Sequence, residues 1–453
     1  MSESSPFSIV MSHASIAVNR FGYGALGHEL FAAKQNPKKW VVEQLQPIIF
    51  TQPLPSSDEV FAQHVKYVEA RKRQKEQMNV ATSTDVKSMG RKYLRSMSVA
   101  TLREAASSTY SVSWRLFDFF SNHFSVTSNG QLLAGLSATL EREAIAPNQL
   151  GHFSDLLLAA VKHPAMIIYL NNEKSIGPNS KQSKKNKKGL NENLAREILE
   201  LHTLGVDGPY NQNDVVELAK GITGWSVSNP RKSKESGFTF RANTHEPGSR
   251  VFMGKRYAQT GIAQGEAMLK DLAIHPATAK HVCYKLAHHF VSETPSPVLL
   301  KSMVSTWHKT QGNIKAVLTD MFNSNEAWLA APQKYKTPRE FVISTLRALG
   351  SIDVKDNMLF ASVTGLGQQP FNAGSPAGYS DNQNDWLGAN ALMSRIDWAI
   401  KAASFNQNAN AEKIMNLSLN LGTDNHTYLS VVRAESRQQA IALLLLSPEF
   451  QRR

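Results

Sequence analysis

GLNENLAREILELHTLG, residues 189–205, is the densest run of chemically versatile side chains in this chain of 453 residues. Asn191 can cap a helix by accepting N–H groups of the first turn. Gly205 stands where a residue in the left-handed conformation would end that helix. The stretch therefore predicts a helix of about three turns.

Helical periodicity places apolar side chains on one face of this stretch and Asn193, Arg196, Glu197 and Glu200 on the other. Two interpretations of this polar stripe stay open. Glu192 to Arg196 and Arg196 to Glu200 are i,i+4 pairs of opposite charge, which stabilise a solvated helix by about 0.2–0.5 kcal/mol each. Alternatively, two carboxylates one turn apart, beside a guanidinium, form a catalytic site.

If the stripe is a site, its catalytic residues are Glu197, Glu200 and Arg196, joined by His123 and His245 from other segments. His123 ends an aromatic helix, and His245 lies in a loop from which a polar group could reach a cleft. A lone histidine on an aromatic helix is also typical of a satisfied core residue. The aspartates of the irregular loop, Asp381 and Asp385, are further candidate partners.

A divalent metal is the cofactor that these residue types allow, with Glu197, Glu200 and His163 as candidate ligands. His163 precedes Pro164, so it is expected at a helix start, where the positive helix end favours neutral imidazole. ExxE is a weaker metal signal than the ExxH motif of di-metal helical bundles. No nucleotide cofactor is expected, because the chain has no GxGxxG and no P-loop.

Other motifs are also missing from the sequence. HExxH and GxSxG do not occur, which argues against metalloprotease and serine-hydrolase chemistry. Cys283 is the only cysteine, so the chain cannot form an internal disulfide or a multi-cysteine metal site. We expect Cys283 to be a buried structural thiol.

A formal net charge of +13 and a pI near 9.6 favour an anionic partner. Part of this charge is concentrated in RKRQK (71–75) and KQSKKNKK (181–188), which simple solvation also explains. The second run would steer an anionic or polyhydroxylated ligand toward the polar stripe. The expected substrate-binding residues are Asn191, Asn193, Lys184, Lys185, Lys187, Lys188, Arg250 and Trp386.

Amphipathic periodicity along most of the chain predicts a mainly α, multi-helical single body with long ordered loops. We expect a tail over 1–13, one helical domain over 14–450, and an exposed helical excursion over about 57–104. Alternation in FTFRAN and RVFMG predicts one small β-hairpin over about 237–253. The glycine- and proline-rich stretch 365–386 is expected to be a long irregular loop.

No apolar run is long enough to span a bilayer, so no transmembrane segment is expected. The first residues show no basic region followed by a long apolar core, so the sequence predicts a cytoplasmic protein by default. A leader preceding this sequence would instead direct export. The oligomeric state is not set by the sequence.

Several motifs together resemble one known family, the bacterial domain-of-unknown-function 1800 family. The resemblance covers about residues 14–450. It rests on NRFGYG (19–24), FDFFSNHFSV (117–126), VKHPAMIIYLNN (161–172), GPNS (177–180), GLNENLAREILELHTLGV (189–206), LAKGITGW (218–225), THEPGSRVFMG (244–254) and SPAGY followed by DW (375–386). The family's name carries no activity, so the resemblance implies kinship and leaves function open.

Two classes of function follow from these observations. The first is an enzyme of the hydrolase or lyase type that uses the Glu/Glu/Arg stripe on an anionic or polyhydroxylated substrate. The second is a non-enzymatic scaffold that binds a polyanion or polysaccharide. No specific nucleic-acid module is recognisable. Burial discriminates between the two classes, since an enclosed stripe favours the enzyme and an open stripe favours the scaffold.

Overall fold

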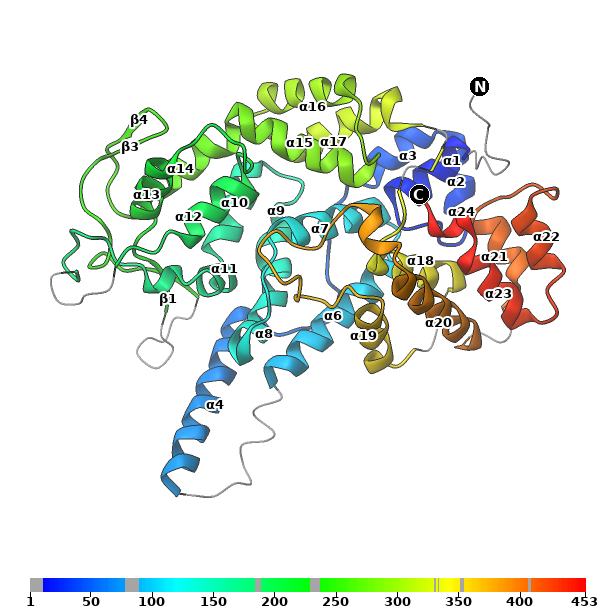
Figure 1. The fold of residues 1–453 in the computed structure, drawn as a ribbon, viewed down its shortest axis with the longest axis horizontal. Coiled ribbons are helices and arrows are strands. Elements are labelled where there is room, and N and C mark those ends of the chain that lie inside the picture. The colour runs from blue at the N-terminus through cyan, green and yellow to red at the C-terminus, as the bar shows by residue number, and fades with distance from the viewer. Residues whose placement is uncertain are drawn as a thin grey trace.

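The computed structural model describes residues 11–77, 89–183, 189–228, 237–329, 331–332, 334–350, 354–405 and 409–453. These residues fold almost entirely into helices, which confirms the mainly α prediction (Figure 1). The helices of the first half are α1 (His13–Ser15), η1 (Ile16–Phe21), α2 (Glu29–Gln35), α3 (Pro37–Glu43), α4 (Ser57–Gln77), α6 (Met89–Ser107), α7 (Ser111–His123), α8 (Gly130–Leu140), η2 (Glu141–Ile145), α9 (Ala146–Asn148), α10 (Phe153–Lys162), α11 (Pro164–Tyr169), η3 (Asn172–Lys174), α12 (Asn193–Glu197), η4 (Ile198–His202) and α13 (Gln212–Gly221).

The second half continues with α14 (Ile262–Ile274), α15 (Pro276–Phe290), α16 (Pro297–Lys309), α17 (Ile314–Asn323), η5 (Asn325–Ala327), α18 (Pro338–Leu349), α19 (Asp356–Gly365), η6 (Gln383–Trp386), α20 (Ala389–Phe405), α21 (Ala411–Ser418), α22 (His426–Val432), α23 (Arg437–Leu446) and α24 (Pro448–Gln451). None of the described helices is long and apolar enough to cross a membrane.

Helix α7 lies near the centre of the body, between α15 on one side and α6 and α8 on the other (Figure 1). Its aromatic residues Trp114, Phe117 and Phe120 are buried, and Phe124 follows at the helix end. Polar residues such as Ser113 and Arg115 are buried along with these aromatic residues, so other elements cover the helix on nearly every side.

Helix α18 packs beside α6 in the same central region (Figure 1). Its start is specified locally, since Pro338 has the fixed φ of a first helical residue. The Thr337 hydroxyl accepts the Glu340 N–H at 3.3 Å, and the Glu340 carboxylate accepts the Thr337 N–H at 2.9 Å. This capping box holds the first turn of α18, and with it Arg339, in one orientation.

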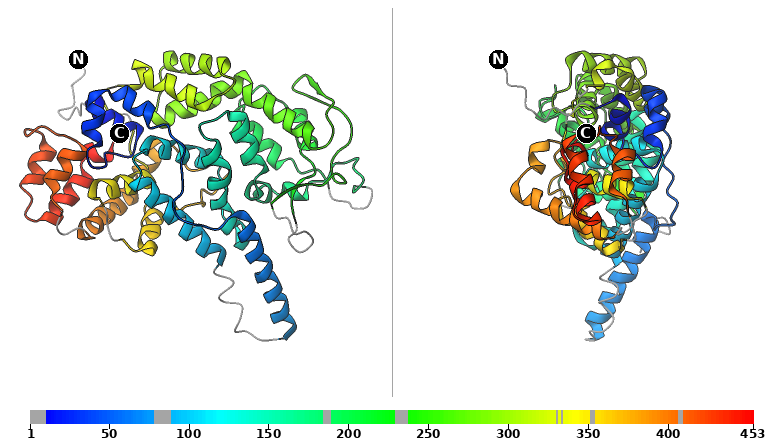
Figure 2. Two further views of the ribbon diagram at one scale, coloured as in Figure 1. Left: turned by 180° about the vertical axis from the view of Figure 1, so that it is seen from behind. Right: turned by 90° about the vertical axis from the view of Figure 1, so that its right-hand side faces the viewer.

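Helix α4 extends away from the body as an arm, and its far end is remote from all other labelled helices (Figures 1 and 2). Arg71, Lys72 and Arg73 are exposed near that end. The chain returns through α6, whose later residues, such as Leu94 and Met97, are buried in the body. The predicted excursion is therefore exposed near its far end, and the part of α6 that packs against α8 belongs to the core.

The β structure differs from the single hairpin that we expected. Strands β2 (Phe238–Phe240) and β3 (Arg250–Phe252) form where alternation predicted them, but they do not pair with each other. Strand β2 pairs antiparallel with β1 (Trp225–Val227), and β3 pairs antiparallel with β4 (Lys255–Tyr257). The hairpin prediction was wrong in its pairing, because alternation marks a strand without specifying its partner.

The last helices form a group at one end of the body, next to the N-terminal helices (Figure 1). The chain end returns to the centre, since Tyr335 and Arg452 form an antiparallel bridge just before α18. Residues 366–386, between α19 and α20, form the long irregular loop that the sequence predicts.

Candidate functional site

The polar stripe of residues 189–205 lies on α12 and on η4, which continues α12 as a wider π-helix. Gly205 adopts a φ of +90° and ends the helix as expected. The Asn191 side chain accepts the Asn193 N–H at 2.9 Å, although Glu192 occupies the cap position itself. Local sequence therefore sets both ends of this helix.

Arg196 is the centre of a ladder of polar contacts. Its guanidinium donates to Glu192 at 3.2 Å, to Glu200 at 3.3 Å and to Gln212 at 3.0 Å. The side chains of Arg196, Glu192 and Glu200 are 39 %, 33 % and 26 % exposed. Partial burial, and then the neighbouring Glu200, raise the pKa of Glu197. This geometry is that of a half-solvated ladder of i,i+4 pairs.

His123 is buried and bonded elsewhere. Its Nε2 lies 3.1 Å from the His202 carbonyl, and its Nδ1 lies 3.1 Å from the Lys285 ammonium. A carbonyl only accepts and an ammonium only donates, which assigns the proton to Nε2. Burial, and then Lys285, lower the pKa of His123 well below its usual value. The ring is thus a neutral group held within the core.

His245 and Arg250 organise the segment between β2 and β3. The His245 Nδ1 lies 2.8 Å from the Thr223 carbonyl, and burial lowers the pKa of this ring. Arg250 donates to the Gln264 side chain at 2.5 Å and to the Glu246 carbonyl at 2.5 Å. These bonds tie the segment to the turn after α13 and to α14, and they engage His245 Nδ1 and Arg250 Nε and Nη2 in structural contacts.

His163 uses both ring nitrogens in structural bonds. Its Nδ1 accepts the Ala165 N–H at 3.2 Å, so the ring caps α11 at the helix start that the sequence predicts. Its Nε2 therefore carries the proton and lies 3.1 Å from the Glu143 carboxylate. No lone pair remains for a metal in this arrangement. Across the described residues, no group of three or more His, Cys, Asp or Glu is placed to hold a metal ion.

Those of the proposed substrate-binding residues that the structure describes do not converge on one place. Asn191 and Asn193 border a shallow open hollow with Lys174, Gly189, Leu190 and Glu192. Lys184, Lys185, Lys187 and Lys188 lie outside the described residues. Trp386 belongs to the irregular loop, where its indole N–H donates to the Ser380 carbonyl at 3.1 Å.

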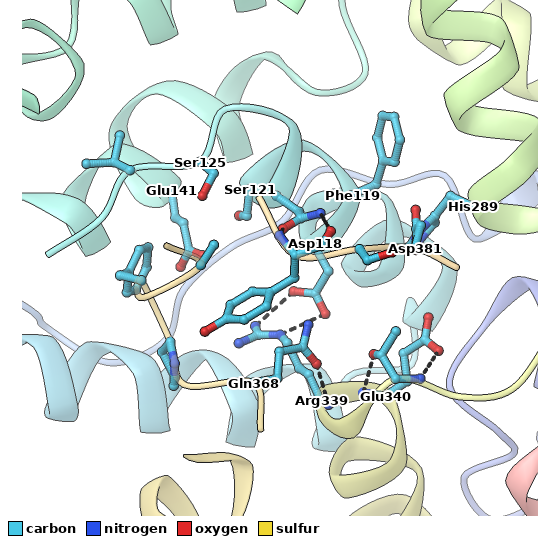
Figure 3. Close-up of a pocket in the computed structure, with 18 residues that line it drawn as sticks. Asp118, Phe119, Ser121, Ser125, Glu141, His289, Arg339, Glu340, Gln368 and Asp381 are labelled. Carbon is cyan, nitrogen blue, oxygen red and sulfur yellow. Dashed lines mark hydrogen bonds and ion pairs between the residues drawn. The ribbon is translucent and has the colours of Figure 1, made fainter. Parts of the chain in front are cut away.

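That loop covers a partly enclosed cavity with about 100 Å³ of water-accessible space, which we call the central cavity (Figure 3). Helix α7, the start of η2, the first turn of α18 and the end of α15 supply the rest of its wall. The lining residues are Asp118, Phe119, Ser121, Asn122, Ser125, Val126, Glu141, His289, Thr337, Arg339, Glu340, Gln368, Pro370, Phe371, Ala373, Tyr379, Ser380 and Asp381.

Glu141 stands at one side of the central cavity, at the first residue of the π-helix η2 (Figure 3). Glu141 is only 5 % exposed, and its carboxyl group forms no ion pair with any described residue. Burial raises the pKa of Glu141 to about 7, although Arg339 partly opposes that effect. A carboxyl group in this state exchanges a proton near neutral pH, which is what a general acid or base requires.

His289 and Asp381 stand at the other side of the cavity (Figure 3). The His289 Nδ1 lies 3.0 and 2.9 Å from the two Asp381 oxygens, and its buried Nε2 has no hydrogen-bond partner. Burial lowers the pKa of His289, so the neutral ring donates its Nδ1 proton to Asp381. Asp381 thereby fixes the tautomer and leaves the Nε2 lone pair free, the arrangement by which a carboxylate prepares a histidine base.

Between these two sides lie Asp118 and Arg339 (Figure 3). The Arg339 Nε donates to Asp118 at 2.9 Å, and Tyr23 donates its hydroxyl to the same carboxylate. The pair brings a positive and a negative group to the cavity wall without leaving a net charge there. Such a pair can reorient toward an anionic group or a hydroxyl.

Beneath the cavity, Glu340 joins two buried guanidiniums. Arg115 and Arg453 both contact its carboxylate, the latter at 3.1 Å, and all three residues are buried. Burial alone would raise the pKa of Glu340, but Arg115 and then Arg453 lower it to about 2. The Arg453 guanidinium also donates to the His289 carbonyl at 2.8 Å, so this network supports the histidine wall.

A family model described as a protein of unknown function, DUF1800, matches residues 16–452. The chain belongs to the DUF1800 family. Comparison of this DUF1800 chain with curated proteins finds no match, and comparison with solved structures finds none. The family therefore establishes kinship over nearly the whole chain, and the chemistry must be argued from the site.

Sequence reasoning placed Asp381 among the candidates of this DUF1800 chain but missed Glu141, Asp118, His289 and Arg339 as site residues. A weak signal did exist for Asp118, a carboxylate between aromatic residues in FDFF, whereas Glu141 begins the charged run EREA and gives no such signal. A charged residue on an apolar helix face is expensive to bury without a reason. The spacing between these segments, however, gives no sign that they meet.

Proposed function

We propose that this protein is an acid–base enzyme of the hydrolase or lyase type, and that its reaction takes place in the central cavity. The observation that carries the proposal is Glu141, a buried carboxyl group at the cavity wall whose pKa is raised to about 7. Strongly shifted acids in an enclosed pocket are typical of catalytic sites. Structural ion networks also shift pKa values, but Glu141 has no ion-pair partner among the described residues.

The opposite wall supplies a second group for proton transfer. His289, oriented by Asp381, presents an unpartnered Nε2 that accepts a proton when neutral. In the proposed reaction Glu141 and His289 act on opposite sides of the substrate, one as acid and one as base. Two titratable groups whose environments differ in this way can divide these roles.

The remaining lining residues favour a small anionic or polyhydroxylated substrate. Hydroxyl and amide groups of Ser121, Asn122, Ser125 and Gln368 can bind hydroxyl groups, while Arg339 can bind a carboxylate or phosphate. Phe119, Phe371 and Tyr379 give the cavity its apolar surface. A water-accessible space of about 100 Å³ holds several water molecules, so the cavity can admit a small substrate or one group of a larger one.

Turnover by matched variants tests this proposal. Wild type, Glu141→Gln and Glu200→Gln would be assayed for ester, glycoside and phosphoester hydrolysis and for β-elimination of hydroxy acids and uronides. We expect Glu141→Gln to lose about 100-fold or more in kcat for any reaction found, with Glu200→Gln unaffected. The dependence of kcat/KM on pH in the wild type should bend near pH 7, because Glu141 titrates there.

The opposite pattern would overturn the assignment to the cavity. Activity that survives in Glu141→Gln but disappears in Glu197→Gln or Glu200→Gln would place the chemistry on the α12 ladder. In that case Arg196, His123 and His245 would again be the residues to test. Absence of turnover in the wild type across all four reaction classes would count against an enzyme of this type.

The polyanion scaffold is the second candidate, and the net charge of +13 and the exposed cations of the α4 arm favour it. Replacing Lys184, Lys185, Lys187 and Lys188 with Gln should then weaken binding to heparin in a salt-dependent way and leave melting unchanged. Equal affinity of wild type and variant at every salt concentration would exclude a role for the lysine run.

A further inference from the structure

Helix α20 has two apolar faces, and the structure covers only one of them. On the inner face, the Arg395 guanidinium donates to the Gln451 side chain at 2.7 Å and to the Lys336 carbonyl at 2.5 Å. The Trp398 indole donates to the Thr345 hydroxyl at 3.3 Å. These buried anchors fix the rotation of α20 about its axis, so the opposite face must point outward.

The outward face carries Leu392, Met393, Ile396 and Ile400, which we call the α20 apolar stripe. These four side chains are between 36 % and 58 % exposed. Leu392, Ile396 and Ile400 are spaced i, i+4 and i+8, so they follow one line along the helix for about 12 Å. Single exposed aliphatic residues are ordinary, but a continuous row of four on one helix is typical of an interaction surface.

Two opposite charges border the same edge of this stripe. Asp397 and Lys401 are exposed and are one helical turn apart, in the i,i+4 relation that usually allows a salt bridge. Yet neither side chain has an ion-pair or hydrogen-bond partner within the described ranges. A second copy of this surface would offer an apolar row to the apolar row and a charge of opposite sign to each unpaired charge, so the surface is self-complementary.

We propose that the α20 apolar stripe joins two copies of this chain as an antiparallel, two-fold dimer. A two-fold axis perpendicular to α20 makes the two α20 helices antiparallel. The edge that carries Asp397 and Lys401 then faces the same edge of the second copy in the opposite direction. Asp397 then approaches Lys401 of the second copy, and the pairing occurs twice. This pairing places the two-fold axis near Ala399, so Ile396 and Ile400 of both copies close the middle of the interface, as in an antiparallel helix pair, and Leu392 and Met393 lie toward its ends. This inference is independent of the reaction proposed for the central cavity.

Disruption of the stripe is the first test, measured by sedimentation velocity of the full chain over a range of concentrations. We expect wild type to dimerise, and Ile396→Glu/Ile400→Glu to raise the dissociation constant by about 100-fold or more, because each substitution enters the interface twice. Val298→Glu, at an exposed aliphatic residue on α16, is the matched control and should dimerise like wild type. A wild-type protein that is monomeric throughout, or a dimer that survives the double substitution, would overturn the proposal.

Charge exchange is the sharper test, because it preserves the apolar contacts. Asp397→Lys and Lys401→Asp should each weaken self-association by about tenfold, since like charges then face one another. A mixture of the two variants should form a mixed dimer of near wild-type affinity, because one copy now presents two lysines and the other two aspartates. Failure of the mixture to recover would refute the antiparallel geometry.

A lipid surface is the competing occupant of an apolar helix face. Flotation with vesicles of phosphatidylcholine and phosphatidylglycerol distinguishes the two cases. Binding of a monomeric wild-type chain that is lost in Ile396→Glu/Ile400→Glu would assign the stripe to membranes and overturn the dimer. If the protein does not float with the vesicles, and the mixture of charge variants recovers the dimer, the dimer proposal is supported.

Discussion

The α12 ladder and the central cavity contain the same kinds of residue in opposite physical states. Arg196 in the ladder and Arg339 in the cavity both pair with carboxylates, but the ladder side chains remain partly in water. Glu200 lies in the half-solvated ladder, whereas Glu141 is buried in the cavity wall, where burial raises its pKa to about 7. Charge in the sequence therefore indicates chemistry only where the surrounding fold removes the solvent.

The largest expected effect is a loss of stability when the Glu340 network beneath the cavity is broken, compared with the same kind of change in the ladder. Glu340→Gln leaves the Arg115 and Arg453 guanidiniums buried without their carboxylate, which typically costs about 3–5 kcal/mol in the free energy of unfolding. Urea denaturation followed by circular dichroism measures this loss. Arg196→Gln is the matched change in the ladder, and it should cost less than about 1 kcal/mol because solvent replaces its partners. Equal losses in the two variants would erase the distinction between the regions.

Next comes the pH dependence of stability caused by Glu141. Its pKa rises from 4.5 to about 7 on folding, so the folded state keeps a proton that the unfolded state releases between these values. The penalty for ionising Glu141 is absent below pH 4.5, grows as pH rises, and is complete above pH 7 at about 3 kcal/mol.

Glu141→Gln removes this penalty, so the stability of the variant relative to wild type should increase by about 3 kcal/mol between about pH 4 and about pH 8. Paired urea titrations at several pH values measure the difference, in which other titrating groups cancel. Glu197→Gln is the ladder control, and it should show a much smaller change over the same range. A difference for Glu141→Gln that stays constant with pH would mean that this carboxyl group is hydrated.

A smaller effect tests the loop that encloses the cavity. Gly378 has a φ of +81°, and a Cβ there would lie 2.5 Å from the Asn122 carbonyl and 2.6 Å from its side-chain oxygen. Gly378→Ala should therefore cost about 1–3 kcal/mol and loosen the loop over the cavity. Gly374 also has a positive φ, but a Cβ there meets no atom within 4 Å. Gly374→Ala therefore measures the cost of backbone strain without a steric clash. Similar losses for both variants would show that close contact with Asn122 is unimportant.

The smallest expected effect belongs to the ladder itself. Glu200→Gln removes one i,i+4 partner of Arg196 while Glu192 and Gln212 still accept from it. The free energy of unfolding should change by about 0.5 kcal/mol or less. Thermal melts of Glu197→Gln and Glu200→Gln, with and without divalent metals, check this expectation. A metal-dependent shift in wild type that either variant abolishes would restore the ladder as a ligand site.

Local physical chemistry, readable from the sequence, determined the elements of this protein. Amphipathic periodicity predicted a mainly α body, Gly205 ended its helix with positive φ, and Pro164 began one after His163. These features depend on neighbours a few residues away, which is why the sequence specifies them. Alternation marked two strands for the same reason, but it could not choose their partners, because pairing depends on segments further along the chain.

Only the tertiary structure decided which charged residues became chemically unusual. Glu141 and Glu200 are the same residue type in helical stretches, and no local feature of the sequence marks Glu141 as the one whose pKa burial raises to about 7. The raised pKa of Glu141 arises because Asp118, Arg339 and the loop carrying Asp381 come from distant parts of the chain to form a cavity around it. Desolvation depends on everything that surrounds a group in space, and a sequence read in order contains only its neighbours along the chain.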